Sequence, residues 1–323
     1  MSHPFDDVKS VRISHSTLKL FRSCPRKFEF RKLYLYPKKD TSLPAEVGKC
    51  LHTGFQHFIM HGDRERAQFA MMLDYPYEVF RESEAADKNT RNVFACYATL
   101  ELMMNMGGFD EWEVATIFDH EGKERDAIEV PFSIEIENFS LSDDRHIPIT
   151  YVGKIDAILF NRRTQEYRVV DIKTHRQNLN DMSGEYAYDD QCLSYGLVLE
   201  RLLGKPIGTL DVTYYSCYID LISPKVLPYT FSKTTDMIED WGRGMYLDLI
   251  NMKFGFIQQW YARKPQACMA FNRKCSFFDL CASRDHHAIQ QMVLMGAEET
   301  GFLKETDFDT PWVNMKLDLG LAA

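Results

Sequence analysis

The sequence has 323 residues, enough for one large domain or for a core with sizeable additions. Hydrophobic residues make up 45% of it, with 17 Gly and 12 Pro, and this composition excludes a collagen-like, low-complexity or wholly disordered protein. The net charge of −9 argues against a general polyanion binder. No segment reaches the roughly 18 apolar residues of a membrane span, and the first residues lack the features of a signal peptide. We therefore expect a cytoplasmic protein without a membrane partner.

Positive charge is concentrated at the start of the chain. Residues 1–40 contain ten Lys and Arg against four Asp and Glu. A basic segment on an acidic body suits local contact with phosphates. A solvated helix face explains the same residues equally well.

The first third of the chain is predicted to be helical. Ser14 or Ser16 can N-cap a helix whose apolar face extends to Leu33, with a break at Pro25. Further helices are expected over residues 47–60, 64–81 (interrupted at Pro76) and 92–106. The basic residues of the first helix are predicted to face outward: Arg22, Arg26, Lys27, Arg31 and Lys32.

From about residue 113 the pattern changes to short β-rich runs. Strands are predicted over residues 113–119, 127–138, 147–160, 166–174, 209–219 and 226–231. A helix over 188–203 separates the fourth and fifth strands, and another is expected over 234–261. The tail after residue 301 has weak periodicity and is expected to be loosely ordered or docked on a partner. This order predicts an α/β protein with a mixed sheet flanked by helices.

Two acidic residues lie in neighbouring predicted strands. A hairpin that pairs residue 161 with residue 166 has a four-residue loop and places Asp156 opposite Asp171. Opposed residues in an antiparallel pair share a face, where two carboxylates repel each other unless a cation lies between them. A shift of one residue in register would separate them.

Lys173 is expected on the same face as Asp171, because side chains alternate along a strand. Carboxylate oxygens suit Mg²⁺ or Mn²⁺, and a nearby ammonium can stabilise charge on a phosphoryl group. The cluster is a candidate site for phosphodiester hydrolysis. A surface Asp–Lys ion pair is the simpler explanation of the D-x-K pattern alone.

The eight cysteines fall into two groups. Four lie among apolar neighbours and are interpreted as core residues: Cys50, Cys96, Cys192 and Cys217. Cys268, Cys275 and Cys281 lie within 14 residues, and closely spaced thiols in a reducing compartment indicate a site for a soft metal, which needs a fourth ligand.

Several motifs occur in an order typical of one nuclease family. They are ISHSTLKLFRSCPRKFEF, GKCLH, GKIDAILF, VVDIKT, QCLSY and the three late cysteines. From about Ile13 to Cys281 the sequence resembles the PD-(D/E)XK nuclease superfamily, in the RecB-like exonuclease branch that includes CRISPR-associated iron–sulfur exonucleases and AddAB helicase–nucleases. The resemblance implies a restriction-endonuclease-like mixed sheet.

The resemblance also implies roles for particular residues. His52, Asp156, Asp171 and the carbonyl of Ile172 would bind Mg²⁺ or Mn²⁺. Lys173 would be the catalytic lysine. Gln191 and Tyr195 match a motif on the following helix, where their i, i+4 spacing puts them on one face.

Two other residues near these motifs are harder to interpret. Glu129 is expected to support the site from a neighbouring strand. The nearby His57 and His61 could mimic a zinc-binding pair, but are interpreted as surface residues.

In the iron–sulfur members of this branch, an N-terminal cysteine joins three late ones to bind a 4Fe–4S cluster. Cys24 would be that ligand here, with Cys268, Cys275 and Cys281. The late spacing departs from the family arrangement, in which two of these cysteines are closer together, so structural Zn²⁺ is an alternative. Buried thiols without a metal are a further alternative.

Together these observations predict four regions: an N-terminal helical region (1–112), the nuclease core (113–232), a helical region with the cysteines (233–300) and a tail (301–323). The predicted function is a Mg²⁺- or Mn²⁺-dependent DNA exonuclease or structure-specific nuclease. By analogy it would act in recombination, repair or CRISPR-type processing in a prokaryote or phage-infected host, with a helicase or recombination partner. The alternatives are a non-catalytic DNA-binding or scaffold protein with the nuclease fold and a zinc-stabilised interaction protein.

Overall fold

A computed structural model describes residues 8–33, 43–82, 91–107, 109, 111–175, 183–204, 206–269, 274–282 and 311–318. The chain forms two compact units, each assembled from separated segments. Unit 1 comprises residues 1–39, 131–153 and 239–323, and unit 2 comprises residues 40–130 and 154–238. The four-region division predicted from the sequence stays a prediction.

Unit 2 contains a mixed sheet. Its strands are β2 (Trp112–Val114), the second half of β6 (Pro148–Asn161), β7 (Glu166–His175), β8 (Thr209–Tyr218) and β9 (Lys225–Thr234). β7 is antiparallel to β6 and parallel to β8, whereas β9 is antiparallel to β8 and β2 to β6. The parallel β7–β8 pair requires a crossover, which contains α7 (Ser183–Ala187) and α8 (Gln191–Leu203). The predicted α/β class, with helices flanking a mixed sheet, is confirmed.

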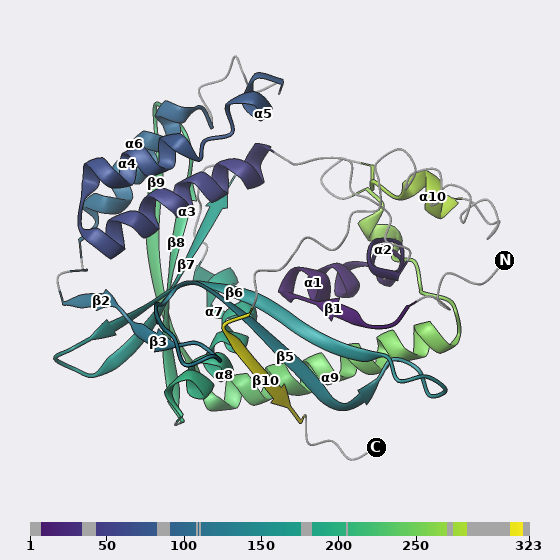
Figure 1. Ribbon diagram of the computed structural model, residues 1–323. Helices are drawn as coiled ribbons and strands as arrows, with labels where there is room; N and C mark the ends of the chain where they lie inside the picture. Colours follow the sequence, from purple (N-terminus) through teal and green to yellow (C-terminus); the bar gives the residue numbers. More distant parts are fainter. Residues whose placement is uncertain are drawn as a thin grey trace. The chain divides into compact units, whose positions relative to one another are not determined.

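Four further helices of unit 2 are α3 (Leu43–His61), α4 (Arg64–Leu73), α5 (Tyr77–Glu82) and α6 (Val93–Asn105). Figure 1 shows α3, α4 and α6 together on one face of β7, β8 and β9. Their buried residues form one core with alternate residues of the strands, including Val170, Ile172 and Tyr215. Odd-numbered residues of β7 lie on the other face, where Lys173 contacts Gln191 of α8. The four cysteines predicted to be core residues are each 0% exposed: Cys50, Cys96, Cys192 and Cys217.

The β6–β7 hairpin has the predicted register. Asn161 pairs with Glu166 and Ala157 with Val170, which confirms the four-residue loop. The Asn161 side chain accepts hydrogen bonds from the amides of Arg163 and Thr164, and Gln165 has a φ of 60°. An Asn that bonds its own turn in this way favours a tight connection.

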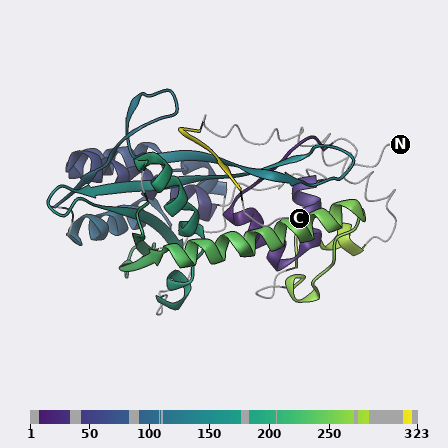
Figure 2. The same ribbon diagram turned by 90° about the horizontal axis from the view of Figure 1, so that it is seen from below.

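Unit 1 contains β1 (Val11–Ile13), α1 (His15–Ser23), α2 (Pro25–Phe28), a π-helix (Glu29–Leu33), a 3₁₀ turn (Pro265–Ala267), α10 (Phe278–Ala282) and β10 (Val313–Leu317). β1 pairs with the first half of β6, and β10 with β5 (Ile128–Ser140), both in parallel. α9 (Thr235–Ile257) is the long helix in Figure 2, and its Trp241 packs on Tyr151 of β6. No described helix is both long and apolar enough to cross a membrane.

Several predictions are corrected by the structure. The strand predicted over 113–119 is two short strands, β2 and β3 (Thr116–Phe118), and β3 pairs with β4 (Glu124–Asp126), which the sequence did not indicate. The tail is not loose throughout, because β10 pairs with β5. Residues 301–310 and 319–323 lie outside the described residues. At the N-terminus, Ser14 rather than Ser16 caps α1, accepting a hydrogen bond from the amide of Thr17.

Candidate active site

The candidate site lies where the β6–β7 ladder opens. Asp156 and Asp171 are the next positions beyond the last paired residues, Ala157 and Val170. Instead of a backbone bond, the Asp156 carboxylate accepts a hydrogen bond of 2.9 Å from the amide of Ile172. A side chain that replaces a ladder bond is fixed against the neighbouring strand. The two acidic residues are therefore positioned by strands and not by loops.

His52 reaches the same point from α3. Its Nε2 lies 3.1 Å from the carbonyl oxygen of Ile172, and its Nδ1 lies 3.5 Å from Oδ2 of Asp156. In either neutral tautomer one ring nitrogen keeps its lone pair, and that nitrogen lies next to an oxygen that is also an acceptor. Two acceptors this close are stabilised by a cation or a proton.

The Lys173 ammonium contacts two side chains, Asp171 and Gln191, and Tyr195 holds Gln191 in turn. The Nζ of Lys173 lies 2.8 Å from Oδ2 of Asp171 and donates a hydrogen bond of 2.6 Å to Oε1 of Gln191. The Gln191 amide nitrogen donates to the Tyr195 hydroxyl at 2.7 Å, and that hydroxyl donates to the carbonyl of Lys154 at 3.1 Å. The predicted common face of Gln191 and Tyr195 is confirmed, and the series fixes the lysine ammonium relative to β6.

Burial and mutual attraction shift the pKa values of Asp171 and Lys173. The Asp171 side chain is 1% exposed, and burial raises its pKa to about 6 although the Lys173 ammonium opposes the shift. Burial also disfavours the charged form of Lys173, but the Asp171 carboxylate outweighs it, so the pKa of Lys173 lies above its usual value. At neutral pH the lysine is therefore a cation.

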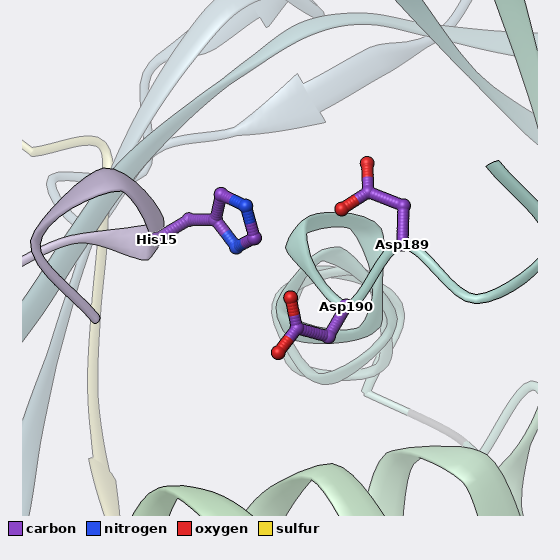
Figure 3. Close-up of side chains that lie close together, drawn as sticks. All are labelled: His15, Asp189 and Asp190. Atoms are coloured by element: carbon purple, nitrogen blue, oxygen red, sulfur yellow. The ribbon is translucent and has the colours of Figure 1, made fainter. Parts of the chain in front are cut away.

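The segment before α8 is held by a buried lysine. Lys233 is 0% exposed and donates to the carbonyls of Tyr186, Ala187 and Asp189 at 2.9, 2.8 and 3.2 Å. The Asp189 carboxylate accepts a hydrogen bond from the amide of Gln191, and Figure 3 shows Asp189 and Asp190 at the start of α8. Lys233 thereby fixes the turn from which Gln191 extends. The sequence did not indicate this role.

Glu129 joins His52 and Asp156 in a cluster whose ligand atoms all lie within 4.8 Å of one another. One of its carboxylate oxygens accepts a hydrogen bond from the side-chain amide of Gln56, and the other lies 3.2 Å from the Lys154 ammonium. The expectation that Glu129 lies beside the site agrees with this position. Lys154 was not among the predicted site residues, although alternation along β6 puts it on the face of Asp156.

The donors in this cluster suit a small divalent cation. Two carboxylates and an imidazole are hard or intermediate ligands that match Mg²⁺ or Mn²⁺, and the carbonyl of Ile172 lies within reach of His52. Of the four predicted ligands, the structure brings together His52, Asp156 and Ile172. The Asp171 oxygen contacts Lys173 instead, and Asp171 does not belong to the cluster.

The four predicted cluster cysteines line one pocket in unit 1. Cys24 enters it from the start of α2, and Cys268, Cys275 and Cys281 from the segment after α9, together with Arg26 and Arg263. A hydrogen bond from the amide of Arg26 to the carbonyl of Ala262 holds the two segments together. Burial raises the pKa of the Cys281 thiol, and the two arginines oppose this shift.

One basic residue is placed differently from the prediction. Arg26 is 5% exposed, and its guanidinium pairs with the buried Glu29 at 2.6 Å and lies over the ring of Phe30. It does not face outward, because the acidic partner one turn away is buried too. Arg22 is exposed and pairs with Asp248 of α9, whereas Lys27, Arg31 and Lys32 are only partly exposed.

Comparison with protein families agrees with the motifs, and solved structures and curated proteins were compared as well. The family model described as the PD-(D/E)XK nuclease superfamily matches residues 12–282. A solved structure from Eubacterium rectale, described as a "Putative exonuclease", shares 12% identity over 87% of this chain and 96% of its own, with a TM-score of 0.47. The solved structure of SSO0001 shares 13% identity over 84% of this chain and 96% of its own, with a TM-score of 0.28. Curated proteins give no match.

Proposed function

Because the chain belongs to the PD-(D/E)XK nuclease superfamily, whose members hydrolyse phosphodiester bonds with divalent metals, we propose that it is a Mg²⁺- or Mn²⁺-dependent deoxyribonuclease that acts on DNA ends or single strands. The observation that carries the proposal is the meeting of His52, Asp156 and the backbone of Ile172 where the β6–β7 ladder opens. Next to it, Lys173 is a charged lysine with a fixed position.

Each residue has a separate task under this proposal. His52, Asp156 and the carbonyl of Ile172 hold the cation, with Asp171 as the further ligand that the family resemblance assigns. When bound, the cation polarises the phosphoryl group and lowers the pKa of a water. Lys173 stabilises the negative charge that develops on the phosphoryl oxygens, and Gln191 and Tyr195 orient its ammonium.

The proposal is tested with labelled single- and double-stranded DNA in Mg²⁺, Mn²⁺ or EDTA. Asp156→Asn and Lys173→Ala should abolish cleavage while DNA binding survives, because they remove contacts to the reacting group and not to the flanking phosphates. Asp211→Asn and Lys225→Ala are matched controls outside the site and should cleave normally. Full cleavage by both site variants would refute the nuclease, and DNA binding without cleavage by the wild type would identify a scaffold.

We also propose that Cys24, Cys268, Cys275 and Cys281 bind a 4Fe–4S cluster. The lining of one pocket by four thiols and two guanidiniums supports an anionic thiolate cluster there. Tetrahedral zinc would hold its sulfurs about 3.8 Å apart, given a Zn–S bond of about 2.3 Å. An iron–sulfur cluster spaces its cysteine ligands more widely than a single zinc ion does, so the metal content of the purified protein distinguishes the two.

Anaerobic purification distinguishes the two metals. A 4Fe–4S protein absorbs broadly in the visible region, whereas zinc is colourless. Cys24→Ser should lose most of its iron and stability, since metal binding contributes to folding, and the core variant Cys96→Ser should keep its iron. Full iron retention in Cys24→Ser would mean that the fourth ligand lies elsewhere. The pathway stays a proposal by analogy: DNA recombination, repair or CRISPR-type processing in a prokaryotic or phage-infected cytoplasm, with a helicase or recombination partner.

A further inference from the structure

We propose that Lys154 is a built-in competitor of the divalent cation: its ammonium neutralises Glu129 in the metal-free site, and metal binding to the cluster of His52, Glu129 and Asp156 requires this ammonium to leave. This inference rests on the proposed metal-dependent function. It adds a ligand, Glu129, and a regulating side chain, Lys154, that the predicted set of His52, Asp156, Asp171 and Ile172 did not contain.

The first line of support is the distribution of partners on Glu129. One carboxylate oxygen accepts from the neutral amide of Gln56, and the other lies 3.2 Å from the Lys154 ammonium. The cluster itself contains two carboxylates and an imidazole. Two negative charges this close repel each other unless a cation lies nearby. Lys154 supplies that cation within the chain, and a divalent ion would supply a stronger one at the same carboxylate.

The second line of support is the backbone of Glu129. Its φ is 50°, a left-handed conformation that costs a non-glycine residue energy and persists only where the surroundings impose it. In a strand, such a residue breaks the regular alternation and redirects its side chain. Here the carboxylate is directed to the ligand atoms of His52 and Asp156.

The third line of support is the solvent exposure that exchange needs. The carbonyl of Lys154 accepts the Tyr195 hydroxyl, so the backbone of this residue is held. Its side chain is 39% exposed and that of Glu129 is 37% exposed, so the ammonium can leave for water without unfolding the strand. The buried pair of Asp171 and Lys173 has no such route on the Asp171 side, which is 1% exposed.

Direct Mn²⁺ binding tests the exchange without DNA or turnover. Titration of the full-length protein, followed by the electron paramagnetic resonance signal of free Mn²⁺, gives the Kd at fixed ionic strength. Lys154→Met should lower the Kd about three- to fivefold, which corresponds to the free energy of a partly exposed ion pair. Glu129→Gln should weaken it roughly tenfold, as expected for loss of a carboxylate ligand. Lys154→Arg keeps the charge and should stay within about twofold of the wild type.

The double variant distinguishes exchange from general electrostatics. If Lys154 competes through Glu129, Lys154→Met should have no effect on the Kd in the Glu129→Gln background. Lys49→Met removes the same charge from the helix of His52, where Lys49 pairs with Glu46, and should leave the Kd unchanged. A weaker or unchanged Kd in Lys154→Met, or equal tightening in both backgrounds, would overturn the inference. Absence of Mn²⁺ binding in the wild type, or unchanged binding in Asp156→Asn, would instead refute the proposed metal site.

Discussion

Removal of the Lys173 ammonium should lower the free energy of unfolding, because the buried Asp171 carboxylate then has no positive charge beside it. We consider Lys173→Met in EDTA, so that no metal compensates for the lost charge. Two unit charges 2.8 Å apart interact by about 6 kcal/mol at an effective dielectric constant of about 20. Met avoids the desolvation cost of the ammonium, and breaking a buried pair typically costs about 3–5 kcal/mol. Because the lysine side chain is 28% exposed, we expect about 3 kcal/mol of destabilisation at pH 8.

The loss of stability in Lys173→Met should depend on pH in a defined direction. Burial raises the pKa of Asp171 to about 6 in the folded protein, above its value in the unfolded chain. An acid with a raised folded pKa favours folding at low pH, and this contribution is lost as the pH rises through the folded pKa. At pH 5 the carboxyl group is protonated in both proteins and the ion pair is absent from both. The deficit of Lys173→Met should therefore be largest at pH 8 and small at pH 5.

Urea unfolding at pH 5, 6, 7 and 8 measures this deficit as a shift in midpoint. The double variant Asp171→Asn/Lys173→Met removes both charges and should recover most of the stability at pH 8, because replacing a whole buried pair by uncharged groups is often neutral. An equal deficit at pH 5 and pH 8, or a double variant less stable than Lys173→Met, would refute the reasoning.

Three other substitutions should report on packing that supports the site and the cysteine pocket. Arg26→Met should destabilise the protein by about 3 kcal/mol in urea unfolding, because it leaves the buried Glu29 carboxylate without its ion pair; a loss below 1 kcal/mol would contradict that pairing. Lys233→Met removes the donor to three carbonyls and should lower kcat for DNA cleavage more than it changes KM; an unchanged kcat would exclude a positioning role. Gly54→Ala should lower the thermal midpoint, since its Cβ would lie 2.8 Å from Cβ of Met71; an unchanged midpoint would show that α4 moves away easily.

The sequence was most informative where the relevant contacts are local. The loop between Asn161 and Glu166 has only four residues, so the hairpin could be aligned and the two acidic residues placed opposite each other. The helical spacing of Gln191 and Tyr195 likewise predicted that they share one face of the helix, where the structure joins them by a hydrogen bond. In both cases, a short connection or a regular period leaves few alternative arrangements.

Prediction was weaker where the partners are far apart in the chain. The contact of Glu129 with Gln56 joins residues of β5 and α3, and its φ of 50° does not follow from any residue pattern. The pairing of β10 with β5 is equally nonlocal. Arg26 is a different case, because its partner Glu29 lies three residues later and was visible in the sequence. What could not be inferred was that both would be buried.

The series from Lys173 through Gln191 to Tyr195 has a direction, and this restricts which amino acids can occupy position 191. Lysine can only donate, so the glutamine must present its oxygen there and its nitrogen to the tyrosine. Glutamate would offer two acceptors and force the hydroxyl of Tyr195 to turn away from the carbonyl of Lys154. Asparagine is one methylene shorter and cannot span both partners. Homologues that keep the lysine and the tyrosine should therefore keep glutamine as well, and the three positions should vary together.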